Sequence, residues 1–364
     1  MCFVAKGIGG IGLVVAVVVA SGCASRTPVA AYTPTSSPVT TITDPAANPN
    51  FKNVGVGPYR ARGPVNVGEG PRSVVVDPGL QQAYVANSDH TVTILDTRSQ
   101  SVKDKFEVDE AFVGGPQSIA VDLATHLIYV IDHGPAEKLL VVDPATNTVT
   151  ARIFTGDEND HRAVAVDSDR HVVYVANDYY GTVTAIDTRT HAVLATIRVG
   201  PEAVALAVDP GSHRLWVAHG RNVSVVDPVT FAVVTTVEVG TDPQDIDIDP
   251  GTNTAFVTDA TGNSNSVFVI DTKTMVVDKI SLGQEPSFAV AVDPTTHTAY
   301  LTSSAFSSIT MIDTRTRTVI ASRRASADAI GRHDTMGIAV DTTYHGVYVT
   351  HGADAETIDV LVPE

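Results

Sequence analysis

A short apolar run that ends in aspartate recurs along the chain. The runs stand at residues 74–77, 119–122, 164–167, 206–209, 246–249, 290–293 and 338–341. Their terminal aspartates are 40 to 48 residues apart. Self-similarity at such a period marks a repeat architecture, in which each unit buries its apolar face against its neighbours. The pattern therefore predicts seven structural repeats.

Each repeat contains further apolar runs. The second is built on an aromatic residue, at 84–87, 129–132, 174–177, 216–219, 256–259, 300–303 and 348–351. The third follows at 92–96, 139–143, 183–187, 223–227, 267–271 and 309–313, and a fourth is looser, as at 192–199. Runs of Val, Ile, Tyr and Thr bounded by turn residues are typical of β-strands, and no stretch has sustained helical spacing. Four strands in a repeat of roughly 44 residues make a propeller blade, so the sequence predicts an all-β, seven-bladed β-propeller with four-stranded blades.

Turn-forming residues separate the runs. Asp-Pro recurs, as at Asp77 and Asp249, and Asp-Thr followed by Arg or Lys recurs, as at Asp96 and Asp271. An aspartate side chain caps its own turn, and proline presets the backbone angle of the next position. We therefore interpret the repeated aspartate as a turn-former and not as a metal ligand.

The last repeat lacks a fourth run, because its third run, at 358–362, is followed by only two residues. Residues 64–68, Pro-Val-Asn-Val-Gly, are similar to the fourth-strand endings at 197–200 and 237–240. We predict that this N-terminal strand completes the last blade. Such closure removes the open strand edge that would otherwise template aggregation.

The repeats resemble those of the YVTN family of β-propeller proteins. Tyr-Val-Ala-Asn stands at 84–87 and 174–177, Val-Asp-Pro precedes the first of these, and Ile-Asp-Thr follows the second. The resemblance covers residues 59–364. It implies that the first strand of each blade lines a central channel, and that the fourth-to-first and second-to-third loops share one binding face. The family includes surface-layer and envelope binding proteins and lactonase-like enzymes, so the resemblance implies a fold and leaves the activity open.

The first 22 residues have the features of an export signal. Lys6 is followed by a small and apolar stretch at 7–20, which is shorter than the roughly 20 residues of a membrane-spanning helix. A charged start, a short apolar stretch and small residues beyond it describe a secretory signal peptide. Residues 20–23, Ala-Ser-Gly-Cys, resemble the bacterial lipobox, whose cysteine receives lipid. We expect a lipoprotein signal peptide at 1–22 and lipidation at Cys23.

Residues 23–58 are rich in Pro, Thr, Ser and Ala and lack periodic apolar positions. Such a segment cannot bury enough surface to order itself, so we expect a disordered tether ahead of a propeller domain at 59–364. The protein is then exported and lipid-anchored to the outer face of the bacterial cytoplasmic membrane or to the cell envelope.

The composition is acidic, with 24 Lys and Arg against 41 Asp and Glu and a net charge of −17. A nucleic-acid partner needs a basic footprint and is excluded. Anionic headgroups repel such a domain, so the lipid alone is expected to hold it to the membrane. Cys2 and Cys23 are the only cysteines, which leaves none in the domain for a disulfide or a multi-cysteine metal site.

Charged side chains flank two of the expected channel-lining strands. Asp-His-Arg stands at 160–162 and Arg-His-Asp at 332–334. The candidate ligand-binding or catalytic residues are Glu158, His161, Arg162, Arg221, Arg332 and His333. These side chains suit an anionic or polar ligand, and they are equally compatible with solvated loops on an acidic protein.

Four histidines on the expected binding face raise the alternative of a metal site. They are His161, His219, His333 and His351. Imidazole suits copper and zinc, but no His-x-His or His-x₃-His spacing supports the site. The sequence requires no cofactor, and it leaves copper, zinc or calcium open.

We expect a binding or interaction module for an envelope protein or for a small polar or anionic ligand. The alternative is a lactonase-like hydrolase, in which Glu158 or His161 acts as a base and Arg162 stabilises developing charge. A metal-binding or redox propeller is the third possibility. Tyr179 and Tyr180, in the third within-blade loop, suit stacking on a sugar or another flat ligand. The sequence has no dimer signature, so a monomer is the default.

Overall fold

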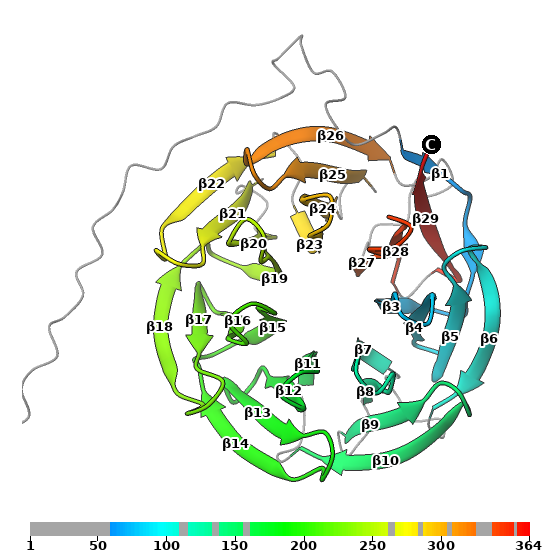
Figure 1. Ribbon diagram of the computed structural model, residues 1–364, viewed down its shortest axis with the longest axis horizontal. Coiled ribbons are helices and arrows are strands. Elements are labelled where there is room, and N and C mark those ends of the chain that lie inside the picture. The colour runs from blue at the N-terminus through cyan, green and yellow to red at the C-terminus, as the bar shows by residue number, and fades with distance from the viewer. Residues whose placement is uncertain are drawn as a thin grey trace, which may run out of the picture. The chain divides into compact units, whose positions relative to one another are not determined.

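The structure, a computed structural model, describes residues 59–108, 116–132, 138–155, 161–260, 266–282, 287–303, 308–324, 337–352 and 355–364. These residues form β-strands joined by turns, and none of them belongs to a helix long and apolar enough to cross a membrane. The strands make seven antiparallel sheets arranged as blades around a centre (Figure 1). The predicted seven-bladed propeller is confirmed. The signal peptide, Cys23 and the tether lie outside the described residues.

The strands of each blade follow one another from the channel outward. Blade one is β3 (Pro71–Asp77), β4 (Gln82–Asn87), β5 (Thr91–Asp96) and β6 (Ser101–Glu107). Blade two is β7 (Pro116–Val121), β8 (Ile128–Asp132), β9 (Lys138–Asp143) and β10 (Thr148–Phe154). Blade three is β11 (His161–Asp167), β12 (Val172–Asn177), β13 (Thr182–Asp187) and β14 (Val193–Arg198). Blade four is β15 (Ala203–Val208), β16 (Leu215–His219), β17 (Asn222–Val226) and β18 (Val233–Glu238).

The remaining blades continue around the ring. Blade five is β19 (Pro243–Asp249), β20 (Thr254–Asp259), β21 (Ser266–Asp271) and β22 (Val277–Ser281). Blade six is β23 (Ser287–Asp293), β24 (Thr298–Ser303), β25 (Ser308–Asp313) and β26 (Thr318–Arg324). Blade seven is β27 (Ile338–Val340), β28 (Val347–Thr350) and β29 (Thr357–Pro363), with β1 (Tyr59–Ala61) and β2 (Val65–Asn66) along its outer edge.

The apolar core is a ring of clusters, one at each boundary between neighbouring blades. At one boundary, Trp216 of blade four packs with Ile246 and Ile248 of blade five. The aromatic residue of every second strand is almost fully buried, namely Tyr84, Tyr129, Tyr174, Trp216, Phe256, Tyr300 and Tyr348. Each ring removes about 150–250 Å² from water. The second strands are buried along most of their length because a neighbouring blade or strand covers them on every side.

The N-terminal strands close the ring as predicted. β1 pairs antiparallel with β29, with Tyr59 opposite Pro363, and β2 pairs with the other end of β29, with Val65 opposite Ile358. The hydroxyl groups of Tyr59 and Tyr300 lie 2.7 Å apart, which ties the closing strand to blade six. The outer edge of blade seven is thus built in two pieces, of which the sequence predicted the second.

The repeated aspartates form turns, as predicted. In blade one, Oδ1 of Asp77 accepts a hydrogen bond from the backbone N–H of Leu80 at 3.1 Å. In blade five, Oδ1 of Asp249 accepts one from the N–H of Gly251 at 2.8 Å. These bonds satisfy backbone donors that the strands leave exposed at their ends.

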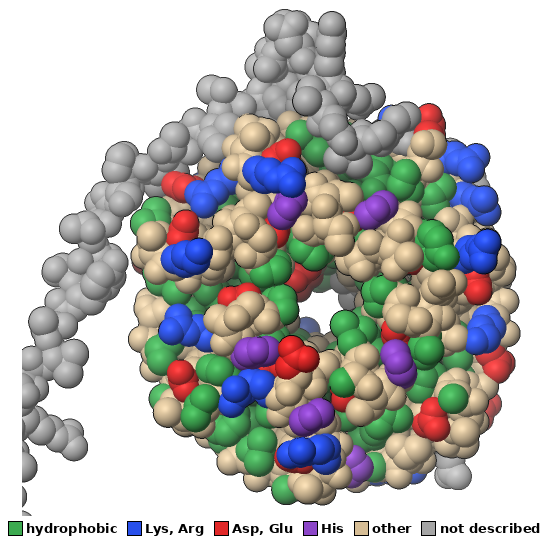
Figure 2. Space-filling model, viewed as in Figure 1, with side chains coloured by type: hydrophobic (Ala, Val, Ile, Leu, Met, Phe, Trp, Pro, Cys, Tyr) green, Lys and Arg blue, Asp and Glu red, His purple; other side chains and the backbone are tan. Residues whose placement is uncertain are grey.

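Four of these aspartates also bind a histidine of the following blade. The pairs are Asp77 and His126 at 2.6 Å, Asp167 and His213 at 3.2 Å, Asp249 and His297 at 2.8 Å, and Asp293 and His345 at 2.7 Å. Each of these histidines has a left-handed backbone conformation, with φ between 56° and 61°. Histidine side chains gather around the central opening on the face shown in Figure 2. Sequence reasoning did not predict that these histidines join neighbouring blades.

Candidate functional site

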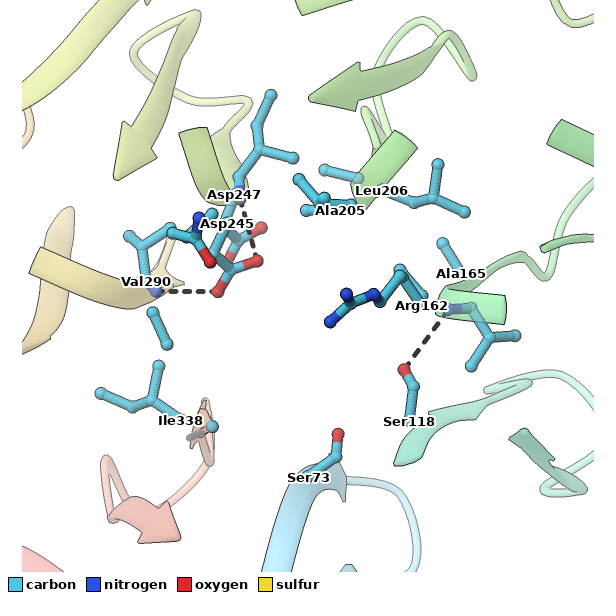
Figure 3. Close-up of a pocket in the computed structure, with 18 of the residues that line it drawn as sticks. Ser73, Ser118, Arg162, Ala165, Ala205, Leu206, Asp245, Asp247, Val290 and Ile338 are labelled. Atoms are coloured by element: carbon cyan, nitrogen blue, oxygen red, sulfur yellow. Dashed lines mark hydrogen bonds between the residues drawn. The ribbon is translucent and has the colours of Figure 1, made fainter. Parts of the chain in front are cut away.

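A cavity of about 460 Å³ occupies the central channel. The first strand of every blade contributes to its wall, as the family resemblance implied. Most of the lining side chains are small or aliphatic, such as Ala165, Ala205 and Ala289. Polar side chains stand out against this background, and they lie on two parts of the wall (Figure 3).

Blade five breaks the repeat pattern of the channel wall. The residue four positions before the terminal aspartate of each run is Ser73, Ser118, Ala163, Ala205, Asp245, Ala289 or Gly337. The residue two positions before that aspartate is Val75, Ala120, Ala165, Ala207, Asp247, Ala291 or Ala339. Blade five alone places carboxylates at both positions. Sequence reasoning missed Asp245 and Asp247, and this departure from the repeat is the signal that identifies them.

The two carboxylates bridge blade five to blade six. Oδ2 of Asp245 accepts a hydrogen bond from the backbone N–H of Val290 at 2.9 Å. Oδ2 of Asp247 accepts one from the N–H of Val292 at 2.7 Å. The second oxygen of each carboxylate accepts the N–H of the residue that follows it. The channel edge of β23 thus gains acceptors that alanine at these positions would not supply.

Burial in the channel wall raises the pKa of Asp245 to about 7 and the pKa of Asp247 to about 6. The backbone hydrogen bonds favour the ionised forms but do not offset this effect. The neighbouring negative charge, of Asp247 on Asp245 and of Asp249 on Asp247, adds to it. Both carboxyl groups therefore keep their protons to a higher pH than an ordinary aspartate does.

Arginine side chains stand on the other part of the channel wall. Figure 3 shows Arg162 of β11 extending into the channel from the side opposite Asp245 and Asp247. Its Nε lies 3.0 Å from Oδ2 of Asp178. Arg72 of β3 also lines the cavity, and its guanidinium donates a hydrogen bond to Gln117 at 2.9 Å. Burial lowers the pKa of Arg72, but arginine stays charged throughout the physiological range. The channel therefore has a basic wall and an acidic wall.

The structure separates the predicted site residues. Arg162 reaches the channel, as described. His161 is buried beside it, with Nε2 2.8 Å from the hydroxyl of Thr155 at the end of blade two. Arg221 is exposed in the turn before β17, 3.4 Å from the carboxylate of Glu238, and is not among the residues that line the cavity. Glu158, Arg332 and His333 lie outside the described residues.

The remaining histidines of the proposed metal set are bonded within their own blades. Nε2 of His219 lies 2.8 Å from the hydroxyl of Ser224, and burial lowers the pKa of the ring. Nε2 of His351 lies 2.9 Å from Oδ2 of Asp359. Within the described ranges, no three His, Cys, Asp or Glu side chains are grouped so that they would hold a metal ion.

No protein-family model matches the chain, and no curated protein matches it in sequence. A solved structure with a similar fold is a chain of Kuenenia stuttgartiensis hydrazine synthase, with 17% sequence identity and a TM-score of 0.69. The similarity covers 81% of this chain and 96% of that chain. At this level of identity, the similarity shows the fold alone.

Proposed function

We propose that the protein is a binding module of the cell envelope that takes a small polar ligand into its central channel. One observation carries this proposal: a channel of about 460 Å³, lined mainly by small side chains, sets Arg162 opposite the carboxylates of Asp245 and Asp247. Small-molecule sites commonly have volumes of about 300–1,000 Å³ and a few polar groups that fix the orientation of the ligand.

The charges of the wall suggest the ligand. A guanidinium pairs with a carboxylate or phosphate through parallel hydrogen bonds. The carboxylates of Asp245 and Asp247 suit an ammonium group on the other end of the molecule. A small zwitterion, with both kinds of charge, therefore fits the channel better than an envelope protein, which is too large to enter it.

This proposal is tested by isothermal titration calorimetry at pH 7.5 with a panel of small zwitterions, including amino acids and betaines. The double variant Asp245→Ala/Asp247→Ala carries the residues that other blades have at these positions, so we expect it to fold. It should bind at least about tenfold more weakly than the wild type. The control Asp104→Ala/Glu107→Ala removes the same number of carboxylates from outer strand β6 and should bind normally. Failure of every compound to bind the wild type contradicts the proposal.

We further propose that the mature protein is held at the envelope by lipid on Cys23, through the tether at 23–58. The proposal is supported by the charged and apolar pattern of the first 22 residues and by the Ala-Ser-Gly-Cys sequence that ends it. Cys23→Ser should move the protein from the membrane fraction to the soluble fraction and abolish labelling by a radioactive fatty acid. Unchanged fractionation and labelling would contradict it.

No contact among the described residues favours the hydrolase or metal alternatives over binding. His161, the candidate base, is buried against Thr155 rather than directed at the cavity, and Glu158 lies outside the described residues. The candidate metal ligands His219 and His351 each bind a side chain of their own blade. The channel charges remain the feature on which the proposed function depends.

A further inference from the structure

Two adjacent tyrosines project from the turn between β12 and β13. Their side chains are exposed, with 78% of Tyr179 and 42% of Tyr180 accessible. The ring centroids are 5.1 Å apart and the planes meet at 86°, an edge-to-face arrangement. Most of the surface of Tyr179 is therefore open to solvent. Exposed rings that are fixed in this way are common anchors of binding surfaces.

The turn that carries the tyrosines is held firmly. The backbone N–H of Gly181 donates to the carbonyl of Asp178 at 3.1 Å, and the carbonyl of Gly181 accepts bonds from Val199 and Gly200. A Cβ on Gly181 would lie 2.2 Å from the carbonyl oxygen of Gly200. The turn therefore packs directly on the end of the outer strand. Because the backbone of this turn is already fixed, a ligand would lose little entropy in ordering the turn itself.

An ion pair starts from the residue that precedes the two tyrosines. Asp178, which precedes Tyr179, is mostly buried and lies 3.0 Å from Nε of Arg162. Arg162 also lines the channel, so this pair lies between the tyrosine turn and the channel wall. A planar guanidinium and a carboxylate offer donors and acceptors in fixed directions.

We propose that Tyr179, Tyr180, Arg162 and Asp178 form a subsite for a pyranose ring of a carbohydrate. A pyranose has an apolar face of C–H groups, which packs on an aromatic ring, and hydroxyl groups at its edge, which both donate and accept hydrogen bonds. The turn carries the rings at residues 179 and 180, and the ion pair starts from the residue that precedes them. It shares Arg162 with the proposed channel site, but it rests on the tyrosines and does not require the channel to be occupied.

Other ligands fit this surface less well. A phosphate would meet a single arginine with the carboxylate of Asp178 beside it, on a chain with a net charge of −17. A quaternary ammonium group needs several rings that enclose it, whereas two perpendicular rings leave it exposed. An apolar peptide needs a pocket for its side chains, and the neighbours of the rings on the turn are Asp178 and Gly181.

The test is calorimetric titration of the purified protein with hexasaccharides of glucose (β-1,4 and α-1,4 linked), mannose, xylose and N-acetylglucosamine. We expect at least one to bind, and we expect Tyr179→Ala to weaken that binding at least about tenfold. Tyr179→Phe, which keeps the ring, should retain most of the affinity. Tyr344→Ala, in the turn after β27, is the matched control and should bind like the wild type.

Absence of binding to every hexasaccharide, or full affinity in Tyr179→Ala, would overturn the proposal. Tyr179-dependent binding of a proline-rich peptide without sugar binding would also overturn it. The Asp245→Ala/Asp247→Ala variant separates the two proposals, because it removes the acidic channel wall and leaves the tyrosine turn intact. Sugar binding that persists in this variant, together with failure of the zwitterion titration, would reject the channel proposal and keep this one.

Discussion

Nδ1 of His297 lies 2.8 Å from Oδ2 of Asp249, across the boundary between blades six and five. The carboxylate of Asp249 is fully buried and also accepts hydrogen bonds from the hydroxyl of Thr314 and the N–H of Gly251. Burial alone would raise the pKa of Asp249, but the bonds from Thr314 and His297 more than offset it and hold the pKa below its ordinary value. One carboxylate thus fixes its own turn and two segments of the next blade.

Loss of this contact should destabilise the ring. We expect His297→Ala to lower the free energy of unfolding by about 1–2 kcal/mol, because it leaves a buried acceptor with fewer partners. His191→Ala is the control, since His191 has a similar left-handed backbone, with φ of 60° against 56°, and stands in an outer hairpin turn. Urea unfolding of both variants isolates the contribution of the contact with Asp249. Equal losses in the two variants would show that the backbone conformation, and not the contact, sets the cost.

Much of the fold was predictable because its determinants are local and repeated. Each repeat has a buried aromatic residue in its second strand, such as Tyr84, and a turn-forming aspartate, such as Asp77. These residues indicate directly where the strands and turns lie. Closure by the N-terminal strand was predictable because the last repeat lacked a fourth run. The contact of His297 with Asp249 was not, since it depends on how two blades are rotated against each other.

The site was less predictable, because it too depends on how the blades pack against each other. Arg162 was identified from its position before a channel-lining strand, and the structure places it in the channel. Asp247 was read as part of the apolar run at 246–249, because the apolar period continues through Ile246 and Ile248, and Asp245 stands just before that run. Only comparison with the small or aliphatic residues at the same positions of the other blades marks these two residues. The partner of each carboxylate, a backbone N–H of blade six, follows from tertiary packing alone.

The closing strands should be essential to the domain. Deletion of residues 59–68 removes β1 and β2 and exposes the edge of β29. It also removes the bond between the hydroxyl groups of Tyr59 and Tyr300. We expect a lower melting temperature and aggregation through the open edge, measured by calorimetry and light scattering against a chain that starts at residue 59. An unchanged melting temperature in the deleted protein would contradict the closure.

Asp245 should make stability fall as the pH rises. Its pKa, raised by burial to about 7, lies above that of an aspartate in the unfolded chain, near 4. Between these values the folded protein binds a proton that the unfolded chain has lost, so the free energy of unfolding falls with rising pH and levels off above about pH 7.

The side chain of Asp245→Asn cannot ionise, so the variant does not lose stability in this way as the pH rises. Relative to the wild type, the variant should gain about 3 kcal/mol between pH 4.5 and pH 8. Urea unfolding at several pH values measures the difference, with Asp104→Asn on outer strand β6 as the reference for removal of an exposed carboxylate. A difference between Asp245→Asn and the wild type that stays constant with pH would contradict burial of the ionisable group.

Gly181 and Gly63 form a matched pair that separates backbone strain from steric clash. Both have left-handed backbones, with φ of 61° and 64°. A Cβ at Gly63 would meet no atom within 4 Å, whereas a Cβ at Gly181 would lie 2.2 Å from the carbonyl oxygen of Gly200. Alanine at Gly63 therefore bears only the cost of the left-handed conformation, about 1 kcal/mol.

Gly181→Ala adds a clash with backbone that cannot be relieved by rotating a side chain. We expect it to lower the free energy of unfolding by about 3 kcal/mol or more, measured by urea unfolding beside Gly63→Ala. Because the turn must move away from Gly200, Tyr179 and Tyr180 should also shift, and any sugar affinity should fall even where the domain remains folded. Equal costs for the two alanine variants would mean that the turn is not pinned against the outer strand, and the tyrosine rings would then lose the fixed geometry on which their proposed role depends.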